Sequence, residues 1–223
     1  MIKICTRNYS FPTVYKDANE GKSIQPKFYY TGDFNGDGKM EVLAVSVNHP
    51  FDDTGKPSMC YVFDLMNDKI MYQGHVFPFN IDFVGTRQEN PDAANNNSDK
   101  LLVMDYDGDG KSDICHINEE GVHIYTFETA GTTICGAKKV NSATTLRKST
   151  LADRRIVMGE FNGDGLTDLL VSPLSKNSND RTWMIYFSRG DGRFDSSTFY
   201  KDNKEGLEFM GQDVNGDGTT DLI

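Results

Sequence analysis

Asp105-Tyr-Asp-Gly-Asp-Gly-Lys-Ser-Asp113 is one of four copies of a nine-residue pattern in this chain of 223 residues. The other copies span Asp33–Glu41, Glu160–Asp168 and Asp213–Asp221. Each copy has oxygen-bearing side chains at positions 1, 3, 5 and 9 and glycines at positions 4 and 6. A hard cation such as Ca²⁺ takes about six to eight oxygen ligands, and glycine adopts the positive φ angles that let a chain curl around an ion. The pattern therefore predicts four calcium-binding loops.

The predicted ligands are the side chains at positions 1, 3, 5 and 9 and the backbone carbonyl at position 7. They are Asp33, Asn35, Asp37, Lys39 and Glu41 in loop 1; Asp105, Asp107, Asp109, Lys111 and Asp113 in loop 2; Glu160, Asn162, Asp164, Leu166 and Asp168 in loop 3; and Asp213, Asn215, Asp217, Thr219 and Asp221 in loop 4. Glu41 and Glu160 stand where the other copies have Asp, and we expect the extra methylene to weaken or reshape coordination. A plain turn is the alternative, since Asn-Gly and Asp-Gly are strong hairpin signals, but a turn does not explain the repeated carboxylates.

The loops differ from an EF-hand, which closes with a bidentate Glu at its twelfth position and lies between two helices. Here the twelfth positions of the first three copies hold Ala44, His116 and Val171. Short apolar runs flank the loops instead, as Leu101–Met104 and Ile114–Ile117 flank loop 2. Such runs are typical of strands, so each loop is predicted to be the turn of a β-hairpin.

These residues resemble the FG-GAP/VCBS repeat, the calcium-loop blade of integrin-α-like β-propellers and of many large secreted or surface bacterial proteins. The resemblance implies an all-β fold, a β-propeller of four-stranded antiparallel blades, with up to four Ca²⁺ as cofactors. We expect a partial propeller, with three full blades and one that is split or truncated. The alternative is a closed four-bladed ring in which residues 1–15 supply two missing outer strands.

The loop starts are 72, 55 and 53 residues apart, which fits one four-stranded blade per loop. We predict a single domain over residues 1–223. Within it, residues 1–16 end a preceding blade, residues 27–77, 100–140 and 155–200 form blades 1 to 3, and residues 207–223 begin a fourth blade.

The residues at position 2 of the four loops are apolar or aromatic, namely Phe34, Tyr106, Phe161 and Val214. An aromatic at constant register in a repeat protein usually packs against its neighbours. We therefore predict that these side chains fill the core between blades and do not contact a ligand.

The net charge of −10 comes mostly from the loops, which hold 13 of the 33 acidic residues, so that the other 20 face 23 Lys and Arg. This balance gives no basis for nucleic-acid binding. No apolar stretch reaches membrane-spanning length. The first residues, Met1–Arg7, lack the apolar core of a signal peptide. We expect either a different export route or an internal piece of a longer protein, and the resemblance implies an extracellular or cell-surface location.

Polar segments gather at positions that should lie on the face opposite the calcium hairpins. They are residues 48–57, 87–99, 141–153 and 173–180. Long loops on one face of a rigid scaffold often carry binding sites, so we expect a protein or glycan ligand there. Neighbouring blades of a longer chain would be further partners.

No catalytic constellation is visible in the sequence, and we predict a non-enzymatic scaffold or interaction module. Propellers of this kind occur in adhesion proteins and beside the Rhs shells of bacterial toxins, as the resemblance implies. The alternative is the propeller of a polysaccharide-acting enzyme such as a lyase, or a carbohydrate-binding module. Sugar sites need exposed aromatic platforms, whereas the single Trp, Trp183, lies in a predicted strand.

Overall fold

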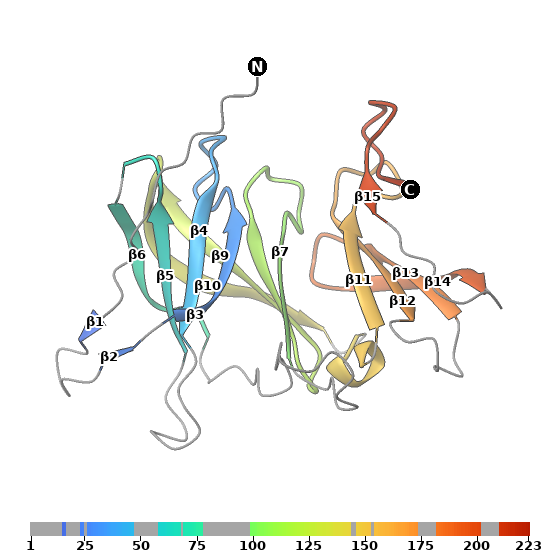
Figure 1. The fold of residues 1–223 in the computed structure, drawn as a ribbon, viewed down its shortest axis with the longest axis horizontal. Coiled ribbons are helices and arrows are strands. Elements are labelled where there is room, and N and C mark those ends of the chain that lie inside the picture. The colour runs from blue at the N-terminus through green and yellow to red at the C-terminus, as the bar shows by residue number, and fades with distance from the viewer. Residues whose placement is uncertain are drawn as a thin grey trace.

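The computed structural model describes residues 15–16, 23–24, 26–46, 58–67, 69–77, 99–143, 146–152, 154–173, 182–201 and 210–223 (Figure 1). The described chain is all-β apart from one short 3-10 helix, and its strands form three four-stranded and two two-stranded antiparallel sheets. The expected all-β fold of four-stranded antiparallel blades is thereby confirmed.

Each four-stranded sheet follows chain order from its first strand to its last. The first sheet contains β3 (Pro26–Gly32), β4 (Glu41–Ser46), β5 (Met59–Asp64) and β6 (Lys69–His75). The second contains β7 (Lys100–Met104), β8 (Asp113–Ile117), β9 (Val122–Ala130) and β10 (Thr133–Ala143). The third contains β11 (Arg154–Gly159), β12 (Asp168–Pro173), β13 (Thr182–Ser188) and β14 (Phe194–Lys201). We call these sheets blades 1, 2 and 3.

Three smaller elements complete the described structure. Strands β1 (Tyr15–Lys16) and β2 (Ser23–Ile24) pair with each other, as do β15 (Gly211–Gln212) and β16 (Asp221–Leu222). The 3-10 helix η1 (Lys148–Leu151) lies between blades 2 and 3 in the sequence. The sequence did not predict it. The proposed blade end at residues 1–16 falls mainly outside the described residues, and of the proposed start of a fourth blade at residues 207–223 the structure describes residues 210–223.

The blades stand side by side, and the β15–β16 hairpin follows blade 3 (Figure 1). In this view blade 1 lies at the left, and blade 3 and the hairpin lie at the right. In all three blades and in the hairpin, a nine-residue loop joins the first two strands, and all four loops point to the upper edge in this view. The structure therefore places the four acidic loops on one face, as the blade assignment requires.

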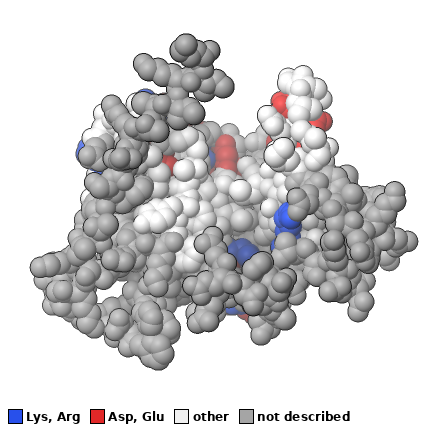
Figure 2. Space-filling view, viewed as in Figure 1, with Lys and Arg blue, Asp and Glu red and all other residues white. Residues whose placement is uncertain are grey.

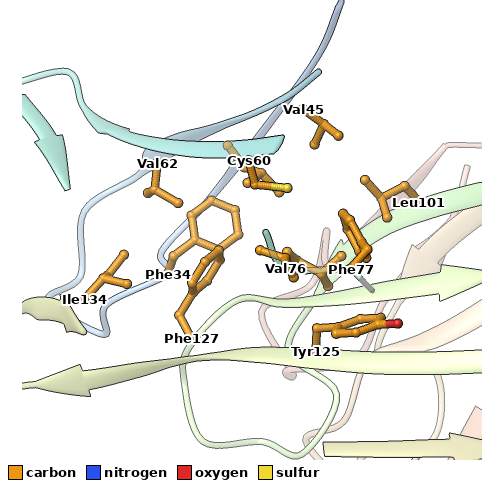
Figure 3. Close-up of a cluster of buried hydrophobic side chains, with 12 residues drawn as sticks. Phe34, Val45, Cys60, Val62, Val76, Phe77, Leu101, Tyr125, Phe127 and Ile134 are labelled. Carbon is orange, nitrogen blue, oxygen red and sulfur yellow. The ribbon is translucent and has the colours of Figure 1, made fainter. Parts of the chain in front are cut away.

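Two cores lie between the three blades. Strand β8 contributes side chains to both cores, because successive side chains of a strand point to opposite faces. Ile114 belongs to the core shared with blade 1, and Cys115 belongs to the core shared with blade 3. In the first core the rings of Phe34 and Phe127 meet edge to face at 5.5 Å, and those of Phe77 and Tyr125 at 5.0 Å (Figure 3). Burial on both faces explains why every residue of β8 is apolar or hydrogen-bonded.

The loop residues at position 2 differ in their burial. Phe34 and Tyr106 are buried between blades, as predicted, and Phe161 is half-buried beside the β15–β16 hairpin. Val214 is 60% exposed, so its prediction as a core residue was wrong. Phe34, Tyr106 and Phe161 each pack toward the blade or hairpin that follows their own loop. No described element follows loop 4, so Val214 has no such neighbour to pack against.

Neighbouring units approach each other closely beside the loops. A Cβ atom built at Gly32, the last residue of β3, would lie 2.7 Å from Ser112 Cβ and 2.8 Å from Val103 Cγ1. A Cβ built at Gly159 would lie 2.7 Å from the Thr220 side chain. Both glycines thus allow a contact between neighbouring units that a larger residue would force apart.

The Gly32→Ala substitution should therefore lower the free energy of unfolding by about 1–3 kcal/mol, the usual cost of overpacking. Urea denaturation would measure this change. Gly136→Ala is the matched control, because a Cβ built there meets only the Glu128 carboxylate, at 3.3 Å. Equal effects of the two substitutions would contradict the close inter-blade contact.

Candidate calcium loops

In the three loops that begin with Asp, the position-1 carboxylate stabilises the turn by accepting hydrogen bonds from backbone amides of the same loop. In loop 2, Asp105 Oδ1 accepts hydrogen bonds from the amides of Gly108 at 2.9 Å and Asp109 at 3.2 Å, and Oδ2 accepts one from Gly110 at 2.9 Å. The two glycines have φ angles of 76° and 83°, in the left-handed region that non-glycine residues rarely adopt. The glycine pattern and the first carboxylate thus act together to close the loop.

The carboxylate at position 9 closes the hairpin at its other end. It begins the second strand and accepts a hydrogen bond from the amide at position 2 in every loop. The pairs are Phe34 N to Glu41 at 2.9 Å, Tyr106 N to Asp113 at 3.4 Å, Phe161 N to Asp168 at 3.0 Å and Val214 N to Asp221 at 3.1 Å. Glu41, Asp113 and Asp168 are buried, with 3%, 2% and 0% exposure.

Loops 1 and 2 bring their acidic side chains together. One carboxylate oxygen from each of Asp105, Asp107, Asp109 and Asp113 lies within 4.8 Å of the others, and the same holds for Asp33, Asp37 and Glu41. Acidic side chains are visible along the upper edge of the molecule (Figure 2). Four convergent carboxylates fit the hard oxygen ligands that Ca²⁺ prefers.

A lysine at position 7 accompanies both clusters. Lys111 Nζ lies 2.8 Å from Asp109 Oδ2, and Lys39 Nζ lies 3.1 Å from Asp37 Oδ2. Each ammonium group partly neutralises the carboxylate at position 5. The predicted ligand from these lysines is the backbone carbonyl, which stays a prediction.

Loops 3 and 4 do not gather three carboxylates within 4.8 Å among the described residues. In loop 3, the longer Glu160 side chain accepts bonds from the Asn162 and Gly163 amides, and the Asn162 amide group donates to Asp164 Oδ2 at 2.9 Å. Asp168 Oδ1 accepts a bond from Ser188 N at 2.8 Å. Protein donors therefore satisfy these oxygens. In loop 4, Asp213 holds the Gly216 and Gly218 amides as Asp105 does in loop 2.

Burial and the charges of neighbouring acids raise the pKa values of Asp113 and Glu41 in these clusters. Burial is the main cause of the raised pKa of Asp113, about 7 against a normal 3.8, and the charges of Asp107 and Asp109 add to it. Burial also raises the pKa of Glu41, with smaller contributions from Asp33 and Asp37. A divalent cation would offset both the lost solvation and the repulsion, so the electrostatics of loops 1 and 2 fit a bound calcium ion.

Hydrogen bonds link each loop to the next, and sequence reasoning missed them. Ser112 N donates to Asp33 O at 2.7 Å, and Ser112 Oγ accepts a bond from Asp33 N at 3.0 Å. The same backbone bond joins Thr167 N to Asp105 O at 3.1 Å and Thr220 N to Glu160 O at 2.5 Å. The hydroxyl residue at position 8 of loops 2, 3 and 4 was the available sequence signal.

The opposite edge carries a buried polar cluster. Asp99 Oδ2 lies 2.9 Å from His116 Nε2, and Asp99 Oδ1 lies 3.0 Å from Lys148 Nζ in η1. Asn118 Oδ1 lies 3.0 Å from His123 Nε2. These bonds attach η1 to blade 2, on the side where the sequence predicts a binding face. Most of residues 48–57, 87–99 and 173–180 lie outside the described part of the chain.

A pocket of about 430 Å³ lies beside η1 at the base of blade 3. Its lining includes Ser149, Thr150, Arg154, Thr182, Met184 and Tyr186. The guanidinium of Arg154 donates a hydrogen bond to Thr182 O at 2.7 Å. The pocket thus combines hydroxyl groups, one positive charge and one aromatic ring.

The fold and the loops define a class of protein: a β-propeller fragment whose blades carry acidic hairpins on one face. A model of FG-GAP-like repeats matches residues 105–171 and 160–223, and the chain belongs to this family. The family resemblance seen in the sequence is confirmed. No curated protein sequence matches the chain. Among the described residues, no helix is long and apolar enough to cross a membrane.

Several solved structures have a similar fold. A lectin from Agrocybe aegerita that specifically recognises non-reducing terminal N-acetylglucosamine matches with a TM-score of 0.56 and 16% identity, over 91% of this chain and 47% of the lectin. The exotype rhamnogalacturonan lyase YesX matches with a TM-score of 0.46 and 16% identity, over 92% of this chain and 40% of the lyase. A rhamnogalacturonan lyase from Bacillus licheniformis gives 0.41 and 15%, over 93% and 41%. The chain thus spans less than half the length of each.

The raised pKa of Asp113 has a consequence for calcium-free protein. A native pKa of about 7 against 3.8 for the unfolded chain means that the folded state binds the proton more tightly. The stability contributed by protonated Asp113 is full below pH 4 and is lost as the pH rises through 7. Urea denaturation of calcium-free protein should therefore show a falling free energy of unfolding across this range.

Asp113→Asn should flatten this pH dependence, because the amide does not titrate. Asp195→Asn, at an exposed site outside the loops, is the control and should leave the slope unchanged. An Asp113→Asn protein with the parental slope would contradict the role given to this carboxylate.

Proposed function

We propose that the chain is a calcium-stabilised propeller module that serves as a scaffold and an interaction surface, without catalytic activity of its own. The observation that carries this proposal is the convergence of Asp105, Asp107, Asp109 and Asp113 within 4.8 Å in loop 2. Calcium would add electrostatic stabilisation at the edge where the blades meet. Asp33, Asp37 and Glu41 would hold a second ion, and loops 3 and 4 would hold up to two more.

The location of the loops supports a structural role for the metal. The carboxylates lie between the first two strands of each unit, and the backbone of each loop bonds to the next loop. An ion bound there would fix neighbouring blades relative to one another. Family membership supports a secreted or surface protein of bacterial type, including those with Rhs or toxin-type shells, as the host of this module.

A glycan is the second candidate partner. The pocket beside η1 favours it, because hydroxyl groups, a guanidinium and Tyr186 can bind the hydroxyl groups and apolar faces of a sugar. The fold likeness to the N-acetylglucosamine-recognising lectin agrees with this candidate. The pocket lies at the edge opposite the acidic loops, where we place the interaction surface.

Calcium removal should lower the melting midpoint. At ~1–2 mM Ca²⁺ and a Kd of ~10⁻⁴ M, one site adds about 1.4–1.8 kcal/mol. Two to four sites would add about 3–7 kcal/mol, and a chain of this size shifts by ~2–4 °C per kcal/mol. Differential scanning fluorimetry in calcium and in excess chelator should therefore differ by roughly 6–28 °C.

Asp109→Ala should reduce this calcium-dependent shift by one site's share, roughly 3–7 °C. Glu128→Ala, at an exposed acid outside the loops, is the control and should leave the shift intact. A chelator effect of less than about 2 °C in the parental protein would mean that the loops are turns and not calcium sites.

A further inference from the structure

We propose that Ser112 is a positioning residue for the neighbouring site: it holds the first ligand of loop 1 in place, so that calcium binding in loop 2 promotes calcium binding in loop 1. This inference rests on the proposed calcium binding. It adds a coupling between sites that the ligand pattern of a single loop does not contain.

The position of Ser112 is the first argument. It stands between Lys111, whose carbonyl is a predicted ligand, and Asp113, the buried carboxylate of loop 2. Its amide donates to Asp33 O at 2.7 Å, and its hydroxyl accepts a bond from Asp33 N at 3.0 Å. One residue of loop 2 therefore fixes both backbone groups of the first ligand of loop 1.

Packing adds a second contact between the same loops. Lys111 Cγ lies 2.9 Å from a Cβ built at Gly36, so the lysine stem covers the turn of loop 1. Gly36 N in turn donates to Asp33 Oδ1 at 2.7 Å. Residues 111 and 112 of loop 2 thus pack directly against loop 1. An ion bound in loop 2 would order these two residues and, through them, the Asp33 carboxylate of loop 1. Such coupling between two binding sites must act equally in both directions.

The other pairs of loops differ in a way that makes the inference specific. Thr220 repeats both bonds of Ser112, with its hydroxyl 2.9 Å from Glu160 N. Between loops 2 and 3, Thr167 N donates a backbone hydrogen bond to Asp105 O at 3.1 Å. Among the described residues, this pair of loops has no second hydrogen bond through the Thr167 hydroxyl. The hydroxyl contribution should therefore be present between loops 1 and 2 and missing between loops 2 and 3.

Hydrogen–deuterium exchange of the full chain, followed by mass spectrometry, can read each loop separately. The peptides that contain residues 33–41 and 105–113 should gain protection as calcium is added, and the midpoint of each titration reports that loop's affinity. Asp109→Ala disables loop 2 and should raise the loop 1 midpoint at least about fivefold, the lower end of ordinary coupling. Asp37→Ala should raise the loop 2 midpoint by the same factor.

Ser112→Ala tests the linking hydroxyl itself. It should raise the loop 1 midpoint by roughly fivefold, which corresponds to one hydrogen bond, while Ser112→Thr should restore the parental value. Thr167→Ala is the matched control, and the loop 2 midpoint should change by less than about twofold.

An unchanged loop 1 midpoint in both Asp109→Ala and Ser112→Ala, with calcium still bound, would overturn the coupling alone. Absence of any calcium response in the parental chain would overturn the proposed function and the coupling with it.

Discussion

The bond from the position-2 amide to the position-9 carboxylate is the interaction on which the rest of the structure depends. It closes each hairpin at the start of the second strand, and in loops 1, 2 and 3 it buries the carboxylate almost completely. Burying a carboxylate is costly unless hydrogen bonds or a cation replace the lost water. One amide supplies part of that replacement. The position-1, position-3 and position-5 acids crowd the same space in loop 2, so a cation is the natural complement.

The same hairpins also set how the blades meet. Each loop joins the first two strands of its unit, and the position-8 residues of loops 2, 3 and 4 bond to the loop before them. Strand β8 starts at Asp113, the last predicted ligand of loop 2, and then supplies side chains to both inter-blade cores. The candidate metal site and the cores are therefore consecutive parts of one segment. A change in the loops should reach the packing of the blades, which is the physical basis for assigning calcium a structural role.

The sequence predicted the parts of this structure that are encoded locally. The loop spacing, the paired glycines and the apolar runs beside Asp105–Asp113 were sufficient to predict the strands at Leu101–Met104 and Asp113–Ile117, because turn chemistry and alternation act over a few residues. The structure brings the four predicted acidic ligands of loop 2 within 4.8 Å of one another. That these residues, or those of the other loops, bind calcium stays a prediction.

The features that the sequence did not reveal depend on contacts between distant residues. Ser112 and Asp33 are 79 residues apart, and Asp99 and Lys148 are 49 apart, so neither bond follows from local pattern. Loop 3 matches the ligand pattern, yet among the described residues its carboxylates do not converge within 4.8 Å as those of loop 2 do. Val214 matches the position-2 pattern but is exposed, because burial at that position depends on the neighbouring unit.

A crystal structure of the chain grown in calcium would test the central claim most directly. The account predicts an ion in loop 2 at ~2.3–2.6 Å from oxygens of Asp105, Asp107, Asp109 and Asp113 and from the Lys111 carbonyl. It also predicts that the Lys111 ammonium moves away from Asp109 Oδ2, from which it lies 2.8 Å in the present structure. Loop 2 with the ammonium still paired to Asp109 and no ion between the four carboxylates, at millimolar calcium, would contradict the account.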